Sequence, residues 1–168
     1  SSETGGSGNQ MTAPHRTLRW AQAADYGAVA DVMFDAVRNG RSRYTDAQRA
    51  AWVPVPRSGP AWDERLRSQE IILAEESEDI LGFMSLASGG YIDFAYIRPR
   101  AQGSGLFRSM YEQLVQRATE KGERRLWVHA SLTAEPAFRA LGFNVVQAET
   151  VFIEDQAFDR FEMEIELR

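Results

Sequence analysis

The chain has 168 residues, 43% of them hydrophobic, which is enough for one domain with a substantial core. It contains no cysteine, which excludes disulfides, thiolate zinc sites and a cysteine nucleophile, and two histidines, His15 and His129, argue against a metal site. The net charge of −5 argues against a nucleic-acid partner and is compatible with a cationic one.

The N-terminal residues differ in composition from the rest. Residues 1–10, SSETGGSGNQ, are polar and contain three glycines, so we interpret them as an expression scar or disordered tail and expect one domain over residues 11–168. The apolar stretches are shorter than a membrane span, and no signal-peptide core precedes Met11. We therefore expect a cytoplasmic protein with no membrane partner.

The first half of the domain is predicted to be mainly helical. A short strand, RTLRWA at 16–21, precedes an amphipathic helix over 23–37. Thr45 is an N-cap candidate for a second short helix over 45–52, which the prolines of VPVPRSGP end. Residues 61–68 can form one or two further helical turns.

The second half is predicted to be a mixture of strands and helices. A meander of three strands is followed by a helix, a strand, a short helix and two closing strands, which predicts an α+β domain with a mixed sheet. The sequence ESED joins the first two strands as a hairpin. The expected strands are 70–77, 79–88, 89–97, 124–131, 144–153 and 159–167, and the expected helices run from 106 to about 121 and from 133 to 142.

The stretch IRPRAQGSGLFRSMYEQL places a glycine loop between a strand and a helix. Pro99 ends the strand because it cannot donate to a ladder. Gly103 and Gly105 permit positive φ angles and leave the N–H groups unshielded. An amphipathic helix begins near Leu106, and a helix N-terminus carries unpaired donors and a partial positive charge. The stretch therefore predicts an anion cradle.

Several loops of this kind bind anions. A P-loop requires a lysine that is absent here, and a dinucleotide fingerprint requires a third glycine where Arg108 stands. The pattern Gln102-x-x-Gly105-x-Phe107 fits a pyrophosphate loop for acyl-coenzyme A. A ligand-free turn between strand and helix remains open from this stretch alone.

Two motifs together resemble the Gcn5-related N-acetyltransferase (GNAT) superfamily along almost all of residues 16–168. YIRPRAQGSGLFRSMYEQL is similar to its strand, Pro, Gln-x-x-Gly-x-Gly/Ala and helix motif, and HASLTAEPAFRALGFNVV to its strand, short helix and closing Leu-Gly-Phe. YTDAQRAAW, AWDERL and GGYID resemble a bacterial branch whose acceptors are mostly unassigned. The resemblance implies a single-domain GNAT-like fold with a mostly antiparallel mixed sheet, flanked by helices.

The resemblance also implies an acetyl-CoA site. By it, the backbone of the fourth strand holds the pantetheine, one N–H group polarises the thioester, and the loop amides bind the pyrophosphate. A short helix lies beside them, where a family tyrosine commonly protonates the leaving thiolate. The implied cofactor-binding residues are Ala95, Tyr96, Ile97, Gln102, Gly103, Ser104, Gly105, Leu106, Phe107, Arg108 and Phe138.

The sequence departs from the family pattern at the catalytic acid. Phe138 stands at the tyrosine position and cannot donate a proton, so Tyr96 and Tyr111 are alternative hydroxyl donors. Phe107 replaces a glycine or alanine but keeps its N–H, and Ser131 or Leu132 occupies the place of a common asparagine. The cofactor site is thus better supported than the acid.

The implied activity is acetyl transfer from acetyl-CoA to an unidentified primary amine, either a small molecule or a peptide amine. Direct transfer in a ternary complex is expected because no cysteine can carry an acyl intermediate. The alternative is a non-catalytic acyl-CoA-binding sensor, which the loss of the tyrosine at Phe138 favours. A homodimer is left open.

Three polar residues are candidates for the catalytic chemistry. Alternation along the fourth strand puts Asp93 on one face with Tyr91 and Ala95, so Asp93 is either the base or a structural anion bonded to backbone amides or to an arginine such as Arg43. His129 has a suitable ordinary pKa for proton transfer, although a satisfied core histidine is the favoured interpretation. Ser131 either contacts the site or caps the strand end.

Aromatic residues mark the expected acceptor channel. Tyr44, Trp52 and Trp62 surround a proline-rich segment, and in this fold that region covers the channel. They form either a wall for the amine substrate or part of the core between helices and sheet. Tyr44 and Trp52 are the residues we expect to bind the substrate.

Overall fold

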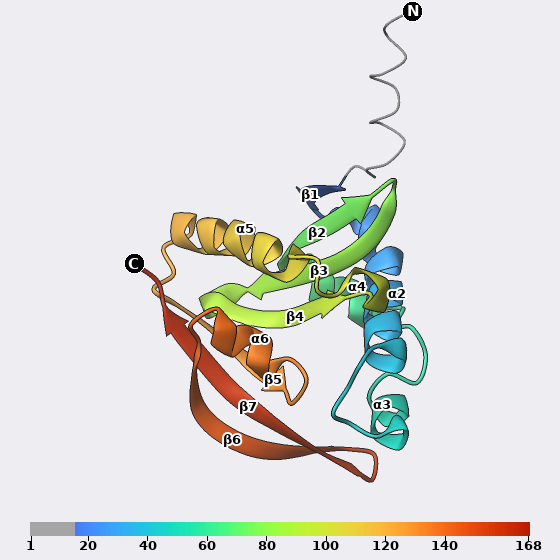
Figure 1. Cartoon of the computed structure of the whole chain (residues 1–168). Coiled ribbons are helices and arrows are strands. Elements are labelled where there is room, and N and C mark those ends of the chain that lie inside the picture. The colour runs from blue at the N-terminus through green and yellow to red at the C-terminus, as the bar shows by residue number, and fades with distance from the viewer. Residues whose placement is uncertain (1–15) are drawn as a thin grey trace, which may run out of the picture.

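The computed structural model describes residues 16–168, so the interpretation of residues 1–10 and the domain start at residue 11 lie outside the described part. Seven strands form one sheet in the order β1-β2-β3-β4-β5-β7-β6, with helices on both faces (Figure 1). No helix within residues 16–168 has the length and apolar character needed to cross a membrane. The strands are β1 (Arg16–Trp20), β2 (Glu70–Glu76), β3 (Asp79–Ala87), β4 (Tyr91–Ile97), β5 (Arg125–Ser131), β6 (Asn144–Ile153) and β7 (Gln156–Glu166). The helices are α2 (Tyr26–Asn39), α3 (Asp46–Trp52), α4 (Pro60–Arg67), α5 (Leu106–Glu120) and α6 (Glu135–Ala140), with short 3₁₀ segments at Ala23–Asp25, Ser88–Gly90 and Pro99–Ala101.

The predicted α+β architecture and mostly antiparallel sheet are confirmed. Every neighbouring pair of strands is antiparallel except β4 and β5. That parallel pair joins only Tyr91 to Trp127 and Ile92 to Val128. The two strands therefore diverge after their first residues, and the edge of β4 that faces β5 has no strand partner from Asp93 to Ile97.

Local sequence explains several element ends. The β2–β3 hairpin turns at Ser77 and Glu78, both with positive φ, where ESED predicts a turn. Thr45 caps α3 as predicted, with its hydroxyl accepting from Gln48 N at 3.1 Å and the Gln48 side chain accepting from Thr45 N at 2.7 Å. The closing strand β7 begins at Gln156, three residues earlier than expected, because it pairs with β6 up to a tight hairpin.

Two hydrophobic clusters lie on opposite faces of the sheet. Helices α5 and α6 cover one face, where Met110, Leu114 and Phe138 are almost fully buried. Helices α2 and α4 cover β2 to β4 on the other face, with Val32 and Leu66 fully buried. Strands β2 and β3 are buried on both faces, which explains their nearly continuous apolar sequences.

A β-bulge in β4 interrupts the side-chain alternation that the sequence predicts for this strand. Met84 lies opposite Ala95 and Leu86 opposite Ile92, so two residues of β4 oppose the single residue Ser85. Ile92 packs against the α5 face, whereas Phe94 packs against the α2 face. The two residues therefore lie on opposite faces, whereas simple alternation would place them on the same face. The Ser85 hydroxyl accepts from Phe94 N at 3.0 Å and stabilises the bulge.

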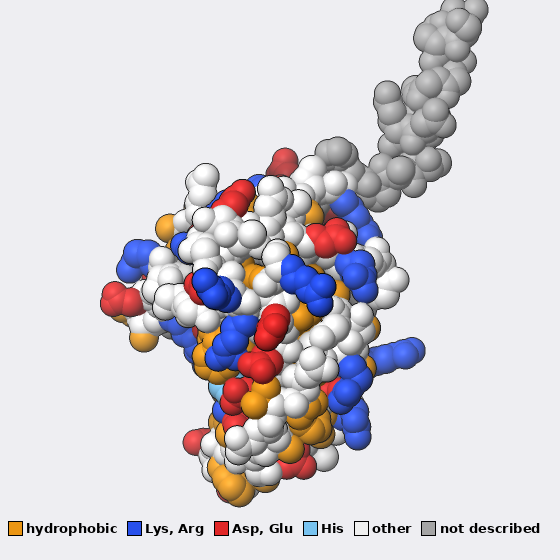
Figure 2. Space-filling model, turned by 90° about the vertical axis from the view of Figure 1, so that its left-hand side faces the viewer, with side chains coloured by type: hydrophobic (Ala, Val, Ile, Leu, Met, Phe, Trp, Pro, Cys, Tyr) orange, Lys and Arg blue, Asp and Glu red, His pale blue; other side chains and the backbone are white. Residues whose placement is uncertain are grey.

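The surface has charges of both signs. Figure 2 shows a face on which acidic and basic side chains are intermingled, with hydrophobic side chains at the lower end, where the β6–β7 hairpin lies. Val146 and Phe152 of β6 are among the exposed large hydrophobic residues.

Candidate active site

The glycine loop presents a row of unpaired backbone donors. Gly103 has φ +77° and Gly105, the N-cap of α5, has φ +87°. None of the N–H groups from Gly103 to Arg108 has a hydrogen-bond acceptor within residues 16–168. A Cβ atom added at Gly103 or Gly105 would meet no atom within 4 Å, so the space in front of the loop is open. The loop therefore has the free N–H donors and the open space that an anion-binding site requires.

Gln102 has a different role from the one expected. Its N–H donates to Pro99 O at 3.3 Å, and its side-chain amide donates to Ile97 O at 3.2 Å. The free amides consequently begin at Gly103, one residue later than predicted. Gln102 holds the end of β4 against the loop.

A cavity of about 280 Å³ runs from the glycine loop to the divergence of β4 and β5. Gly103 and Phe107 line it at the loop end. The unpartnered edge of β4 lines its middle, and that edge can pair with an extended amide-containing ligand as a neighbouring strand would. The sequence-predicted residues among its lining are Trp52, Ala95, Tyr96, Ile97, Gln102, Gly103, Phe107 and Ser131.

A second cavity, of about 130 Å³, lies on the far side of the same divergence. It contains three of the predicted polar or aromatic site residues that the first lacks, Tyr44, Asp93 and His129, and it also reaches Phe138. Both cavities are lined by Trp52, Ala95, Tyr96, Ser131 and Ala134. The two cavities therefore meet beside the free edge of β4.

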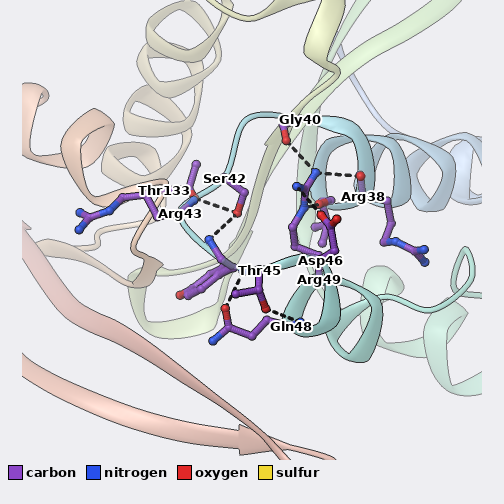
Figure 3. A network of polar contacts seen from close by, with 11 residues as sticks. Arg38, Gly40, Ser42, Arg43, Thr45, Asp46, Gln48, Arg49 and Thr133 are labelled. Atoms are coloured by element: carbon purple, nitrogen blue, oxygen red, sulfur yellow. Dashed lines mark hydrogen bonds and ion pairs between the residues drawn. The ribbon is translucent and has the colours of Figure 1, made fainter.

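The segment of residues 40–45, between α2 and α3, crosses the divergence and joins its two sides (Figure 3). The Ser42 hydroxyl lies 3.3 Å from the Thr133 hydroxyl, and Arg43 N donates to Thr133 Oγ1 at 3.1 Å. The buried Tyr44 hydroxyl donates to Asp159 O at 2.5 Å and accepts from Leu132 N at 3.1 Å. Burial raises the pKa of Tyr44.

Asp93 is fully engaged by neighbouring side chains. Arg65 donates to its two oxygens at 2.7 and 2.9 Å, and Gln69 donates to Oδ2 at 2.7 Å. The partner is thus Arg65 of α4, and not Arg43 as the sequence suggested. The hydrogen bonds with Asp93 raise the pKa of Arg65. This geometry suits a structural anion at the bulge better than a free base.

His129 lies in the cavity wall with one ring nitrogen held. Its Nδ1 is 2.9 Å from the Tyr91 hydroxyl, and its ring packs edge-on against Trp127 and Tyr91. Burial raises the pKa of Tyr91, so that hydroxyl stays protonated at neutral pH. His129 is half-buried and lines the cavity, and its held Nδ1 also fits a satisfied core histidine, so its catalytic role stays a prediction.

Acidic side chains adjoin His129 on its outer side. One atom each of His129, Glu149 and Glu162 lie within 4.8 Å of one another. Arg160 Nε donates to Glu149 at 2.6 Å, which neutralises that carboxylate, while Glu162 has no ion pair within residues 16–168. The surroundings of His129 therefore carry a net negative charge.

The remaining candidates divide between cavity and core. The Ser131 hydroxyl accepts from Ala134 N at 3.0 Å, so it caps the strand end while lining both cavities. Trp52 is part of the cavity wall and contacts Tyr96 and Phe158. Trp62 is buried against Phe94 in the core.

Phe138 is both core and cavity lining. Its side chain is 1% exposed and its ring lies 5.2 Å from Phe107 and 5.1 Å from Phe143, centre to centre. Tyr111 is likewise buried in the core under α5 and is not among the residues that line the two cavities. Tyr96 lines both cavities, and its hydroxyl makes no hydrogen bond within the described residues. Burial raises the pKa of Tyr96 well above its usual range.

Several site residues were missed from the sequence. Tyr91, Arg65 and Thr133 belong to the site through their contacts with His129, Asp93 and Arg43. The sequence does contain an indication for Tyr91. It alternates with Asp93 along one strand, as Trp127 alternates with His129 along another. Arg65 and Thr133 lie 28 and 90 residues along the chain from their partners, so no local pattern marks them.

Comparisons with known proteins agree on one family. The sequence matches the family described as Acetyltransferase (GNAT) domain over residues 41–167. The uncharacterized N-acetyltransferase YafP of Escherichia coli K12 is 28% identical over 147 residues, covering 87% of this chain and 93% of that protein.

Solved structures share the fold. A GCN5-related N-acetyltransferase from Rhodopseudomonas palustris, also described as an aminotransferase of class II, has a TM-score of 0.84 at 24% identity, covering 90% of this chain and 95% of that one. The acetyltransferase yncA of Salmonella typhimurium, solved with its cofactor acetyl-CoA, has a TM-score of 0.67 at 21% identity, covering 92% and 95%.

Proposed function

Because the chain belongs to the GNAT acetyltransferase family, with acetyl-CoA as its co-substrate, we propose that it transfers the acetyl group directly to a primary amine in a ternary complex. The observation that carries the proposal is the meeting of two cavities at the free edge of β4. One cavity leads from the unpaired loop amides and suits the coenzyme. The other opens on His129 and suits the amine.

The described residues fit the coenzyme in three places. Free amides from Gly103 to Arg108 face open space and suit the pyrophosphate, whose charge the N-terminus of α5 also stabilises. The unpartnered edge of β4 suits the two amides of the pantetheine. An N–H group of that edge, near Ala95, can donate to the thioester oxygen as negative charge develops there.

His129 is the residue that takes the proton of the amine. When Nδ1 donates to the Tyr91 oxygen, Nε2 carries the lone pair that a proton acceptor requires. Asp93 is less suited, since three donors from two side chains already occupy its carboxylate. The unpaired Glu162 near His129 favours the approach of a cationic amine before it loses its proton.

The proton balance of the transfer uses two groups. The amine nitrogen attacks the thioester carbon and forms the C–N bond, and His129 accepts the proton that the nitrogen loses. The C–S bond then breaks, and Tyr96, which lines both cavities, is the residue we propose as proton donor to the departing sulfur. A thiol has an ordinary pKa of about 8.5, so the sulfur can also leave unprotonated near pH 8.

The test measures release of free CoA from acetyl-CoA with a panel of small amines and a short peptide. We expect His129→Gln to lower kcat by about 10² or more without changing acetyl-CoA affinity, as loss of a general base requires. Tyr91→Phe keeps the ring but removes the hydrogen bond to Nδ1, so a smaller fall in kcat is expected. Unchanged turnover in His129→Gln would contradict the assignment, and no turnover by the wild-type chain with any amine would contradict the activity.

A further inference from the structure

We propose that Arg41 binds the pyrophosphate of acetyl-CoA from the side opposite the glycine loop. This inference rests on the coenzyme site of the proposed function. Arg41 lines the cavity that also contains Gly103, whose N–H group is the first of the free amides. Its exposed guanidinium has neither a hydrogen bond nor an acidic partner within residues 16–168. A free fork of N–H donors beside an anion cradle suits a phosphate group.

The backbone on the N-terminal side of Arg41 is fixed. The Arg49 guanidinium donates to the carbonyl oxygens of Val37, Arg38 and Gly40 at 2.7 to 2.8 Å (Figure 3). A Cβ atom at Gly40 would lie 2.6 Å from Ala36 O, so only glycine permits this close return of the chain onto α2. These contacts determine where the 40–45 segment leaves the helix.

The backbone on the C-terminal side is fixed as well. Ser42 and Arg43 both contact the Thr133 hydroxyl on the opposite side of the cavity (Figure 3). Ser42 and Thr133 line the same cavity as Arg41. Arg41 therefore starts from a backbone held at both ends, and ordering its side chain on a phosphate costs less entropy than it would from a free loop.

Arg43 provides a matched control two residues away. It is exposed and carries the same charge on the same segment, but its side chain lines neither cavity. Figure 3 shows its guanidinium pointing away from the Arg38, Arg49 and Gly40 contacts. A general effect of positive charge would be the same at both positions, whereas a direct phosphate contact is expected at Arg41 alone.

The experiment is titration calorimetry of the full chain with acetyl-CoA, 3′-dephospho-CoA and pantetheine. We expect Arg41→Ala to weaken acetyl-CoA binding about five- to tenfold at low salt, with a smaller effect at high salt, and Arg43→Ala to change it less than about twofold. Arg41→Lys should retain part of the affinity, because it keeps the charge but loses the fork. The loss in Arg41→Ala should persist with 3′-dephospho-CoA and vanish with pantetheine.

Three results would overturn the proposal. Equal weakening by both alanine variants would show a general charge effect, and weakened pantetheine binding would show a disturbed segment instead of a phosphate contact. A loss confined to ligands with the 3′-phosphate would move the contact away from the pyrophosphate. Each of these leaves the proposed function intact, because wild-type acetyl-CoA binding and CoA release test that separately.

Discussion

The two sides of the divergence between β4 and β5 recognise their ligands by different means. On the coenzyme side, backbone amides from Gly103 to Arg108 lack acceptors within the described residues, so donors are available before any ligand arrives. On the amine side, Asp93 and Arg160 are already paired with Arg65 and Glu149. A site made of backbone tolerates changes of side chain, whereas a site made of paired side chains changes with each substitution. The first suits a constant coenzyme and the second a variable acceptor.

The largest effect is expected from closing the open backbone of the loop. Gly105→Val adds a β-branched side chain at φ +87°, where L-residues are strained, and fills the space before the amides. We expect acetyl-CoA affinity to fall on the order of a hundredfold in calorimetry. The free energy of unfolding should fall by about 1–2 kcal/mol from the backbone strain.

Gly122 separates these two effects. It has φ +85° and equally open surroundings, but it follows the C-terminal end of α5. Gly122→Val should lower stability as much as Gly105→Val and leave acetyl-CoA binding unchanged. If both variants bound the coenzyme equally well, the amides of the loop would not be its phosphate site.

On the amine side, Asp93→Asn is expected to affect stability more than chemistry. The side chain of Asp93 is 11% exposed and that of Arg65 is 48% exposed, so the ion pair is only half shielded from water. We expect a loss of about 1–2 kcal/mol in the free energy of unfolding by urea titration. Turnover of the folded enzyme should fall by less than about tenfold, below the ~10² that loss of a general base costs.

A double-mutant cycle with Arg65→Gln distinguishes the two roles of Asp93. If the carboxylate serves only to hold Arg65, the double variant should be little less stable than either single variant, because the interaction is lost once. If Asp93 is instead the general base, kcat should be low in every variant that lacks its carboxylate, whether or not Arg65 is also replaced. A hundredfold fall in kcat for a well-folded Asp93→Asn protein would transfer the base from His129 to Asp93.

Much of the coenzyme side could be predicted from sequence because its information is local. Pro99, Gly103, Gly105 and the helix from Leu106 are contiguous, and each acts on backbone conformation. The motif therefore describes the geometry directly. The difference lies at Gln102, whose backbone N–H donates to Pro99 O, so the row of free amides begins at Gly103.

The side-chain contacts on the amine side could not be predicted from the sequence, because they join segments that are far apart in the chain. The bulge opposite Ser85 turned Phe94 away from the face of Ile92, and simple alternation has no means of including an extra residue. The partner of Asp93 comes from α4, and the Tyr91 hydroxyl contacts His129 across the parallel pair of β4 and β5. Pairing of this kind depends on strand order and register, which composition and periodicity do not contain.

The smallest effect is expected at the position where the two sides touch. Phe138→Tyr adds a hydroxyl to a ring that is 1% exposed and packed between Phe107 and Phe143, yet part of that ring lines the amine-side cavity. We expect the variant to fold, with a stability loss of about 1 kcal/mol in urea titration from the added volume. Its kcat should change by tenfold or less, below the ~10² of a positioned acid, because Tyr96 is the proposed proton donor and a thiolate can leave without one. Tyr96→Phe should then lower kcat more than Phe138→Tyr changes it, and combining the two should recover part of the loss. A rise of several orders of magnitude in Phe138→Tyr alone would show that no other group donates the proton, and would remove Tyr96 from the mechanism.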